Sequence, residues 1–127
     1  MAMIFAVVDD MFFAAKIRGT AEQLGIPVKI VKGSEKIAGD ECAPQLIIVD
    51  LQAGRFDPFT VAAKVKADAR LREAKLLGFF SHVEGELARR ARASGFDFVM
   101  PRSVFAKRLP DILRGELDAE KTKDASG

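Results

Sequence analysis

Short apolar runs alternate with amphipathic stretches along almost the whole chain, and this alternation constrains the fold more than any other feature. The apolar runs are "MIFAVV" (3–8), "PVKIV" (27–31), "QLIIVDL" (45–51), "KLLGFFS" (75–81) and "FDFVM" (96–100). They are short and rich in β-branched and aromatic residues, which is typical of buried strands. Apolar strands that alternate with helices predict a parallel sheet covered by helices on both of its faces.

The stretches between these runs predict helices. Their ranges are 11–25, 34–42, 57–71, 83–95 and 103–117. Gly25 gives the first helix a natural C-terminal stop, and Asp57 followed by Pro58 is a specific signal for a helix start. Gly39 weakens the short helix at 34–42, and Pro110 predicts a kink or a restart within the last helix.

The size and charge of the chain favour a single domain that does not bind nucleic acid. The chain has 127 residues, of which 49% are hydrophobic, and this is enough for one core. We predict one domain over residues 1–117 and a polar, disordered tail over residues 118–127. The net charge of +2 comes from 20 positive and 18 negative residues that are spread along the chain, so no basic patch for nucleic acid is evident.

Several other classes are excluded by individual residue types. Cys42 is the only cysteine, so neither an internal disulfide nor a cysteine-based zinc site can form. The single histidine excludes metal sites built on several histidines. The apolar run at the N-terminus is too short for a secretion signal or a membrane span. We therefore expect a cytoplasmic protein with no membrane partner.

Polar side chains follow three of the predicted strands at the point where each strand ends. Asp9 and Asp10 follow the first strand. Asp50 ends the third strand, and Ser81 ends the fourth. Ligands of such sheets bind at the carboxyl ends of the strands, and carboxylates that converge there repel each other unless a cation such as Mg²⁺ relieves the repulsion. Alternatively, one of the two adjacent aspartates caps the helix beginning near Met11, and Ser81 caps the helix after it.

The order and spacing of these residues resemble those of the CheY-like receiver domains of bacterial response regulators. The motifs are "VVDD" (7–10), "LIIVDL" (46–51) and "GFFSH" (78–82), and the resemblance extends from residue 3 to about residue 115. It implies a flavodoxin-like, three-layer α/β sandwich with about five helices and five parallel strands in the order 2-1-3-4-5. It also implies that Asp50 accepts a phosphoryl group, that Ser81 contacts this group, and that Mg²⁺ is held by Asp9, Asp10 and Asp50.

Receiver domains also carry a lysine after the fifth strand, and this chain has no lysine at that point. If the motif is aligned on Pro101, Met100 stands in the lysine position. If residues are counted from Gly95 or Asp50, Arg102 stands there instead. We favour Arg102, because the geometry of a strand end follows the residue count more directly than one proline, and because arginine can pair with a phosphate.

The resemblance implies a response regulator of a two-component system that signals through protein contacts. Because the chain ends soon after the last predicted helix, we expect it to be stand-alone and not an enzyme. Its expected partners are a histidine kinase or phosphotransfer protein and a downstream protein target. Phosphorylation is expected to draw in the loop after the fourth strand and to repack Phe98. A partner surface or homodimer contact is expected over helix 83–95, strand 96–100 and helix 103–117. Its basic residues are Arg89, Arg90, Arg92, Arg102, Lys107 and Arg108.

Two alternatives remain open. A phosphorylation-independent pseudo-receiver could serve as a protein-interaction module through Arg89, Arg90 and Arg92; the irregular turn "QAGRFDP" (52–58) motivates this hypothesis. A flavin carrier can share the same sheet topology, but it needs a phosphate loop rich in glycine and hydroxyl groups after the first strand. The chain has the acidic and bulky "DDMFFAA" (9–15) there, which disfavours a flavin carrier.

Overall fold

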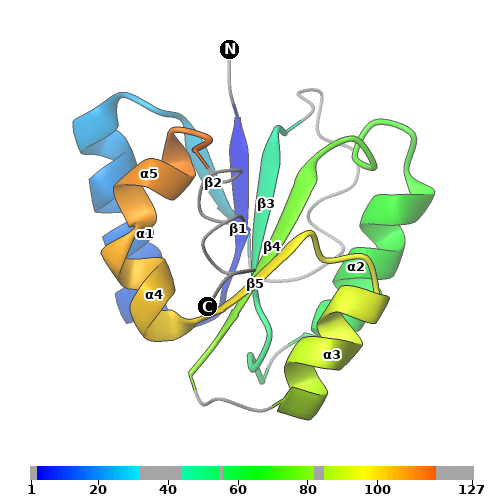
Figure 1. The fold of residues 1–127 in the computed structure, drawn as a ribbon. Coiled ribbons are helices and arrows are strands. Elements are labelled where there is room, and N and C mark those ends of the chain that lie inside the picture. Colours follow the sequence, from blue (N-terminus) through cyan, green and yellow to red (C-terminus); the bar gives the residue numbers. More distant parts are fainter. Residues whose placement is uncertain (1–2, 32–43, 55, 82–84, 117–127) are drawn as a thin grey trace.

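The computed structural model describes residues 3–31, 44–54, 56–81 and 85–116, and it contains a five-stranded sheet. The strands are β1 (Ile4–Val7), β2 (Val28–Val31), β3 (Leu46–Asp50), β4 (Lys75–Phe80) and β5 (Phe98–Pro101). All neighbouring strands are parallel, and their order is β2-β1-β3-β4-β5 (Figure 1). Both the five predicted strands and the predicted strand order are confirmed.

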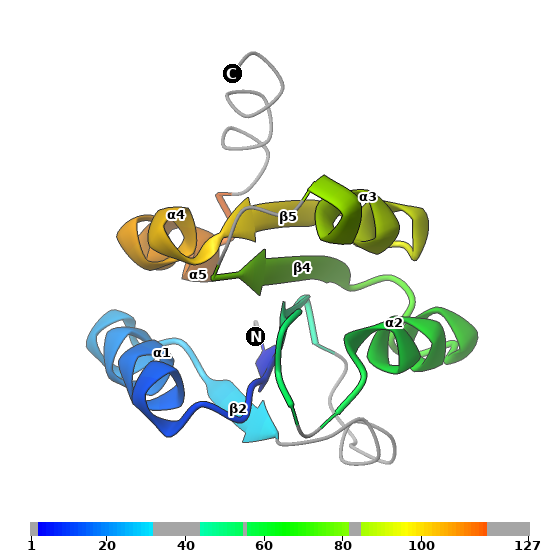
Figure 2. The same ribbon diagram turned by 90° about the horizontal axis from the view of Figure 1, so that it is seen from below.

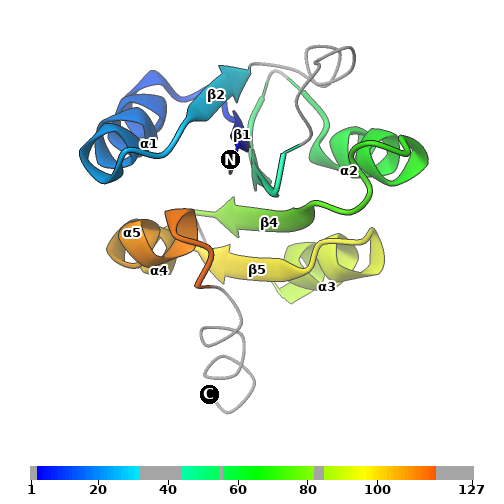
Figure 3. The same ribbon diagram turned by 90° about the horizontal axis from the view of Figure 1, so that it is seen from above.

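Helices cover both faces of this sheet. They are α1 (Met11–Leu24), α2 (Pro58–Ala67), α3 (Gly85–Ala93), α4 (Arg102–Lys107) and α5 (Leu109–Leu113). Helices α1, α4 and α5 lie on one face, and α2 and α3 lie on the other, which gives the expected three layers (Figures 2 and 3). The helix predicted at 34–42 and the tail predicted at 118–127 lie outside the described residues. No helix in the described ranges is long and apolar enough to cross a membrane.

Local sequence signals set the ends of the first two helices. Gly25 adopts a left-handed conformation (φ 71°), and its N–H donates to the carbonyls of Ala21 and Glu22, which terminates α1. Asp57 caps α2 through a hydrogen bond of 3.0 Å from the N–H of Phe59, directly before Pro58. Both predicted signals therefore act as the sequence indicates.

Two helices differ from their predicted ranges. The helix predicted to reach residue 71 ends at Ala67, because the carboxylate of Asp68 accepts a hydrogen bond of 2.8 Å from the N–H of Arg70 and starts a turn. The single helix predicted at 103–117 is divided into α4 and α5. Pro110 lies in the first turn of α5, where its missing N–H costs no helical hydrogen bond, so the predicted restart is confirmed.

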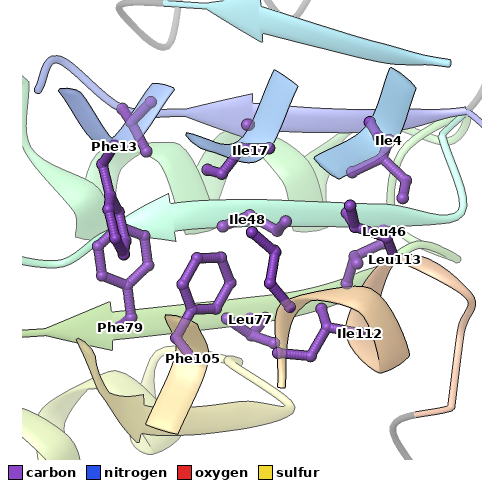
Figure 4. Packing of buried hydrophobic residues seen from close by; sticks show 14 of the residues in the cluster. Ile4, Phe13, Ile17, Leu46, Ile48, Leu77, Phe79, Phe105, Ile112 and Leu113 are labelled. Carbon is purple, nitrogen blue, oxygen red and sulfur yellow. The ribbon is translucent and has the colours of Figure 1, made fainter. Parts of the chain in front are cut away.

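The core on the α1, α4 and α5 side of the sheet contains a cluster of three aromatic rings near the carboxyl ends of the strands. Phe13 of α1, Phe79 of β4 and Phe105 of α4 lie with ring centroids 4.7–5.5 Å apart (Figure 4). Such ring pairs stabilise a core beyond the burial of their area. The cluster ties α1 and α4 to the same strand, so the N-termini of these two helices are fixed relative to each other.

The core on the other face is packed between the sheet and helices α2 and α3. Val61 and Val65 of α2 and Ala91 of α3 are fully buried there against Ile47 and Val49 of β3. Because β3 is covered on both faces and flanked by strands on both edges, its carboxyl end is held rigidly.

Gly78, in the middle of β4, makes a close backbone approach that a larger residue would not permit. A Cβ atom at this position would lie 2.8–2.9 Å from three side-chain carbons of Leu51, which is itself buried. We therefore expect Gly78→Ala to lower the free energy of unfolding by roughly 1–3 kcal/mol, as overpacking typically does. Urea denaturation measures this loss.

Gly19 provides the matched control for this substitution. It lies on the exposed face of α1, and no heavy atom lies within 4 Å of the position that its Cβ would take. Gly19→Ala is expected to raise the free energy of unfolding by about 0.5–1 kcal/mol, because alanine has less conformational freedom to lose. Equal effects of the two substitutions would contradict the close packing of Gly78 against Leu51.

Candidate functional site

A polar pocket of about 210 Å³ opens at the carboxyl edge of the sheet. It lies where β1, β3 and β4 end and where α4 begins. Its lining residues are Asp9, Asp10, Asp50, Gln52, Phe79, Ser81 and Arg102. All five site residues predicted from the sequence, namely Asp9, Asp10, Asp50, Ser81 and Arg102, are brought together here. The carboxyl ends of parallel strands meet at one edge of a sheet, which is the reason for this convergence.

Asp10 has two structural roles in this pocket. Its Oδ1 atom caps α1 by accepting hydrogen bonds from the N–H groups of Phe12 (2.9 Å) and Phe13 (3.3 Å). Its Oδ2 atom accepts a hydrogen bond of 2.6 Å from the Arg102 guanidinium. Desolvation raises the pKa of Asp10, but the hydrogen bonds from Phe13, Arg102 and Phe12 outweigh it, so this pKa lies below its usual value. The predicted capping alternative is therefore confirmed for Asp10.

Asp50 is the half-buried carboxylate at the end of β3. Its Oδ1 atom accepts a hydrogen bond of 3.0 Å from the N–H of Gln52, which fixes the orientation of the carboxyl group. Burial is the largest cause of a raised pKa for Asp50, and the negative charges of Asp9 and Asp10 raise it further. The Gln52 N–H and the Arg102 charge act in the opposite direction without cancelling the rise. A carboxylate with this kind of environment is typical of functional sites.

Ser81 is tied to the loop after β3 by the side chain of Gln52. The Oε1 atom of Gln52 accepts hydrogen bonds from both the N–H (2.5 Å) and the hydroxyl (2.6 Å) of Ser81. These two contacts connect the loops after β3 and β4 across the pocket. Residues 82–84 lie outside the described residues, so the alternative in which Ser81 caps the next helix stays a prediction.

Arg102, and not Met100, brings a positive charge into the pocket. Met100 is buried, with 2% of its surface exposed, and it belongs to the core on the α1 side. Arg102 is the first residue of α4, and its guanidinium carbon lies 4.7 Å from the centroid of the Phe13 ring. This stacking holds the guanidinium beside Asp10.

The carboxylates of the pocket have the right chemistry for Mg²⁺, but they are not grouped as a set of three ligands. Mg²⁺ prefers carboxylate oxygens in nearly octahedral geometry. Within the described residues, no three Asp, Glu, His or Cys side chains are grouped so that they could hold a metal ion. Both oxygens of Asp10 are engaged, one by the N–H groups at the N-terminus of α1 and the other by Arg102.

Gln52 and Phe79 line the pocket but were not predicted as site residues. A glutamine in a turn has no distinctive sequence pattern, although its position two residues after Asp50 places it in the loop that borders the site. Phe79 looks like any other core residue of a buried strand. Only the parallel pairing of Asp50 with Phe79 brings this ring to the edge of the site.

Phe98 lies near the amino ends of the strands, whereas the polar pocket lies at their carboxyl ends. It is the first residue of β5 and pairs with Leu77. It lines a separate pocket of about 490 Å³ at the amino ends of the strands, together with Ile4 and Leu46. The residue of β5 that pairs with Phe79 is Met100. The expectation that Phe98 responds to events at Asp50 is therefore not supported by its position.

The basic residues predicted to form a partner surface are divided between two faces of the molecule. Arg89, Arg90 and Arg92 are exposed on α3, which covers the α2 side of the sheet (Figure 2). Arg90 stacks over Phe59 of α2, and its guanidinium carbon lies 4.0 Å from the centroid of the Phe59 ring. Lys107 and Arg108 lie at the end of α4 on the other side. A continuous basic face would therefore have to cross the edge strand β5.

No protein-family model matches this sequence, and no curated protein is significantly similar to it. Similarity appears in three dimensions instead. A response regulator from Hahella chejuensis has a TM-score of 0.79 at 20% identity, covering 90% of this chain and 93% of that one. The chemotaxis response regulator CheY4 of Vibrio cholerae has a TM-score of 0.77 at 16% identity, with 90% and 97% covered.

A third similar structure is the phosphorylated cyanobacterial phytochrome response regulator RcpA. Its TM-score is 0.74 at 18% identity, and the match covers 90% of this chain and 89% of that one. Identities of this size show a shared fold. The chain therefore has the CheY-like receiver fold, as the motifs in the sequence implied.

The two roles of Asp10 can be separated by two substitutions. Asp10→Ala removes both the helix cap and the ion pair, and we expect a loss of about 1–2 kcal/mol in the free energy of unfolding. Asp10→Asn keeps a good capping oxygen and loses only the ion pair with the partly exposed Arg102, so its loss should stay below about 1 kcal/mol. Urea denaturation of both variants measures the difference, and equal losses would contradict the capping role.

The environment of Asp50 makes the stability of the protein depend on pH. Between the ordinary pKa of an aspartate and the raised pKa of Asp50, the folded state binds more protons than the unfolded state, so the free energy of unfolding falls as pH rises through this window. Asp50→Asn removes the charge, and we expect the variant to be more stable than the wild type at neutral pH.

The gain from Asp50→Asn should shrink as pH falls below the window, where Asp50 of the wild type is already neutral. Urea denaturation over a pH series measures this trend. Asp57→Asn is the matched control, because asparagine also caps a helix well at this exposed start of α2 and should bring no such gain. A loss of stability for Asp50→Asn at neutral pH would contradict the prediction.

Proposed function

We propose that this protein is a receiver of two-component signalling that accepts a phosphoryl group on Asp50 and signals through contacts with other proteins. The observation that carries the proposal is the environment of the Asp50 carboxylate. It ends a strand buried on both faces, and it shares one pocket with the Ser81 hydroxyl and the Arg102 guanidinium. The receiver fold and its similarity to a phosphorylated response regulator support this proposal.

The proposed donor is a phosphohistidine of a histidine kinase or phosphotransfer protein. A carboxylate oxygen of Asp50 attacks the phosphorus atom, and the bond between phosphorus and the imidazole nitrogen breaks. The electron pair of that bond stays on the imidazole, which takes up a proton, and an acyl phosphate forms on Asp50. Because the Gln52 N–H holds Oδ1, the other carboxylate oxygen, Oδ2, is the better placed nucleophile.

The new phosphoryl group would change the hydrogen bonds of the pocket. Its oxygens carry negative charge and are stronger acceptors than the carboxamide of Gln52. The hydroxyl of Ser81 would therefore exchange its bond to Gln52 for one to the phosphoryl group. This exchange would shift the loop after β4 and present an altered surface to a downstream protein target.

Mg²⁺ stays a prediction of the family resemblance. Asp9, Asp10 and Asp50 are the residues that would hold it, and no step above depends on it. In the present arrangement Asp10 is engaged by Arg102.

Intact-mass spectrometry tests the proposal. The protein is incubated with acetyl phosphate and, in parallel, with phosphoramidate, each with and without Mg²⁺. We expect the mass of one phosphoryl group to be added to the wild type and not to Asp50→Asn. Asp57→Asn, which changes an exposed aspartate away from the pocket, is the matched control and should be modified like the wild type.

A second candidate function is a protein-interaction module that works without phosphorylation. It is favoured by one observation: Gln52 already engages Ser81 and Arg102 already engages Asp10, so the pocket is internally satisfied. This function predicts no modification of Asp50 by either donor. It also predicts a partner whose binding is lost in a combined Arg89→Ala and Arg92→Ala variant and is unchanged in Asp50→Asn. The opposite pattern would support the receiver.

A further inference from the structure

We infer that the guanidinium of Arg102 takes the place of a divalent cation in the acidic pocket and thereby keeps such cations out of it. The inference concerns the same pocket as the proposed function. It does not depend on whether Asp50 is ever phosphorylated, because it is tested through cation binding alone.

The carboxylate oxygens of Asp10 already have partners in this pocket. A cation bound between the strand ends would need oxygens from the acidic residues that line the pocket, which are Asp9, Asp10 and Asp50. Both oxygens of Asp10 are in use, because Oδ1 caps α1 and Oδ2 lies 2.6 Å from the Arg102 guanidinium. The described part of the chain also contains no group of three side chains arranged to hold a metal ion.

Arg102 is held in place by its position in the chain and by the Phe13 ring. Its position in the chain is fixed because it begins α4 directly after Pro101, the last residue of β5. Its guanidinium stacks on Phe13, and the Phe13 ring is locked in the aromatic cluster with Phe79 and Phe105. Figure 4 shows these three rings lying against one another. The guanidinium therefore comes from a rigid scaffold and does not belong to a freely rotating surface arginine.

The charge of Arg102 partly balances the negative charges of the pocket. Three carboxylates line the pocket, and Arg102 is the basic residue among its lining side chains. Its charge acts on Asp50 as well as on Asp10, so it offsets the mutual repulsion that would otherwise favour a bound cation. An arginine at this position therefore lowers the electrostatic attraction of the pocket for a cation.

A divalent cation that entered the pocket would meet two penalties. It would have to displace the guanidinium from its contact with Asp10, which costs up to about 1 kcal/mol in a partly exposed pair, and it would remain close to a positive charge that repels it. Together these penalties are expected to weaken divalent-cation binding by roughly tenfold relative to a pocket in which the arginine is replaced by a neutral residue.

Two measurements of cation binding test the inference. Mn²⁺ takes the same oxygen ligands as Mg²⁺, and it broadens the amide signals of nearby residues in ¹H–¹⁵N NMR spectra. Isothermal titration calorimetry with Mg²⁺ gives the dissociation constant. Both are carried out on the wild type and on Arg102→Gln and Arg102→Met; the second variant keeps an apolar chain over Phe13.

Arg114→Gln is the matched control. Arg114 also pairs with an aspartate, Asp111, at 3.3 Å, but the pair lies at the end of α5 and does not line the acidic pocket. Its loss should not alter cation binding. The same NMR spectra report whether each variant is folded, so a misfolded variant is recognised and the other one is used.

We expect Mg²⁺ to bind the Arg102 variants roughly tenfold more tightly than it binds the wild type and Arg114→Gln. We also expect Mn²⁺ to broaden the signals of Asp10, Asp50 and Gln52 in the Arg102 variants at concentrations that leave the wild type unchanged. The inference is overturned if the wild type and the folded Arg102 variants bind Mg²⁺ with the same affinity.

Discussion

The burial of β3 on both faces of the sheet is the constraint on which the remaining structure depends. Residues Leu46–Val49 are completely enclosed, so the chain can return to solvent only where the strand ends. Asp50 lies at that point, between the buried residues of β3 and the polar pocket that it lines. The rigidity of the strand fixes the backbone of Asp50, and the Gln52 N–H fixes its carboxylate. An apolar strand that ends on a carboxylate is thus a means of placing one charge accurately.

The electrostatics of the pocket follow from the same topology. Parallel strands deliver their carboxyl ends to one edge, and in this chain three of the residues delivered there are aspartates. Their repulsion must be offset, and the structure contains two devices for this. The N-terminus of α1 donates two N–H groups to Asp10, and the first residue of α4 donates a guanidinium. Both devices depend on helices that the Phe13 and Phe105 rings anchor to β4.

The contact between Gln52 and Ser81 gives the pocket a second internal connection. It joins the loop after β3 to Ser81, the residue that follows β4, and so connects the surroundings of Asp50 to the end of that strand. In a receiver, this connection would be the first to be exchanged when Asp50 gains charge. In an interaction module without phosphorylation, it would keep one surface permanently in place. The same hydrogen bonds therefore serve either function, and the chemistry at Asp50 decides between them.

The sequence by itself determined the elements of the fold. Five apolar runs, the stop at Gly25 and the start at Asp57 placed strands and helices, because strand burial and helix capping are local effects that a single segment encodes. The strand order came from the resemblance of the motifs to receiver domains. It also predicted that Asp9, Asp10, Asp50 and Ser81 meet, since strand ends in a parallel sheet share one edge. Only the tertiary structure decided that Arg102 faces this site while Met100 is buried, and that Gln52 holds Ser81. These contacts join segments far apart in the chain, and their geometry depends on how α4 packs on the sheet.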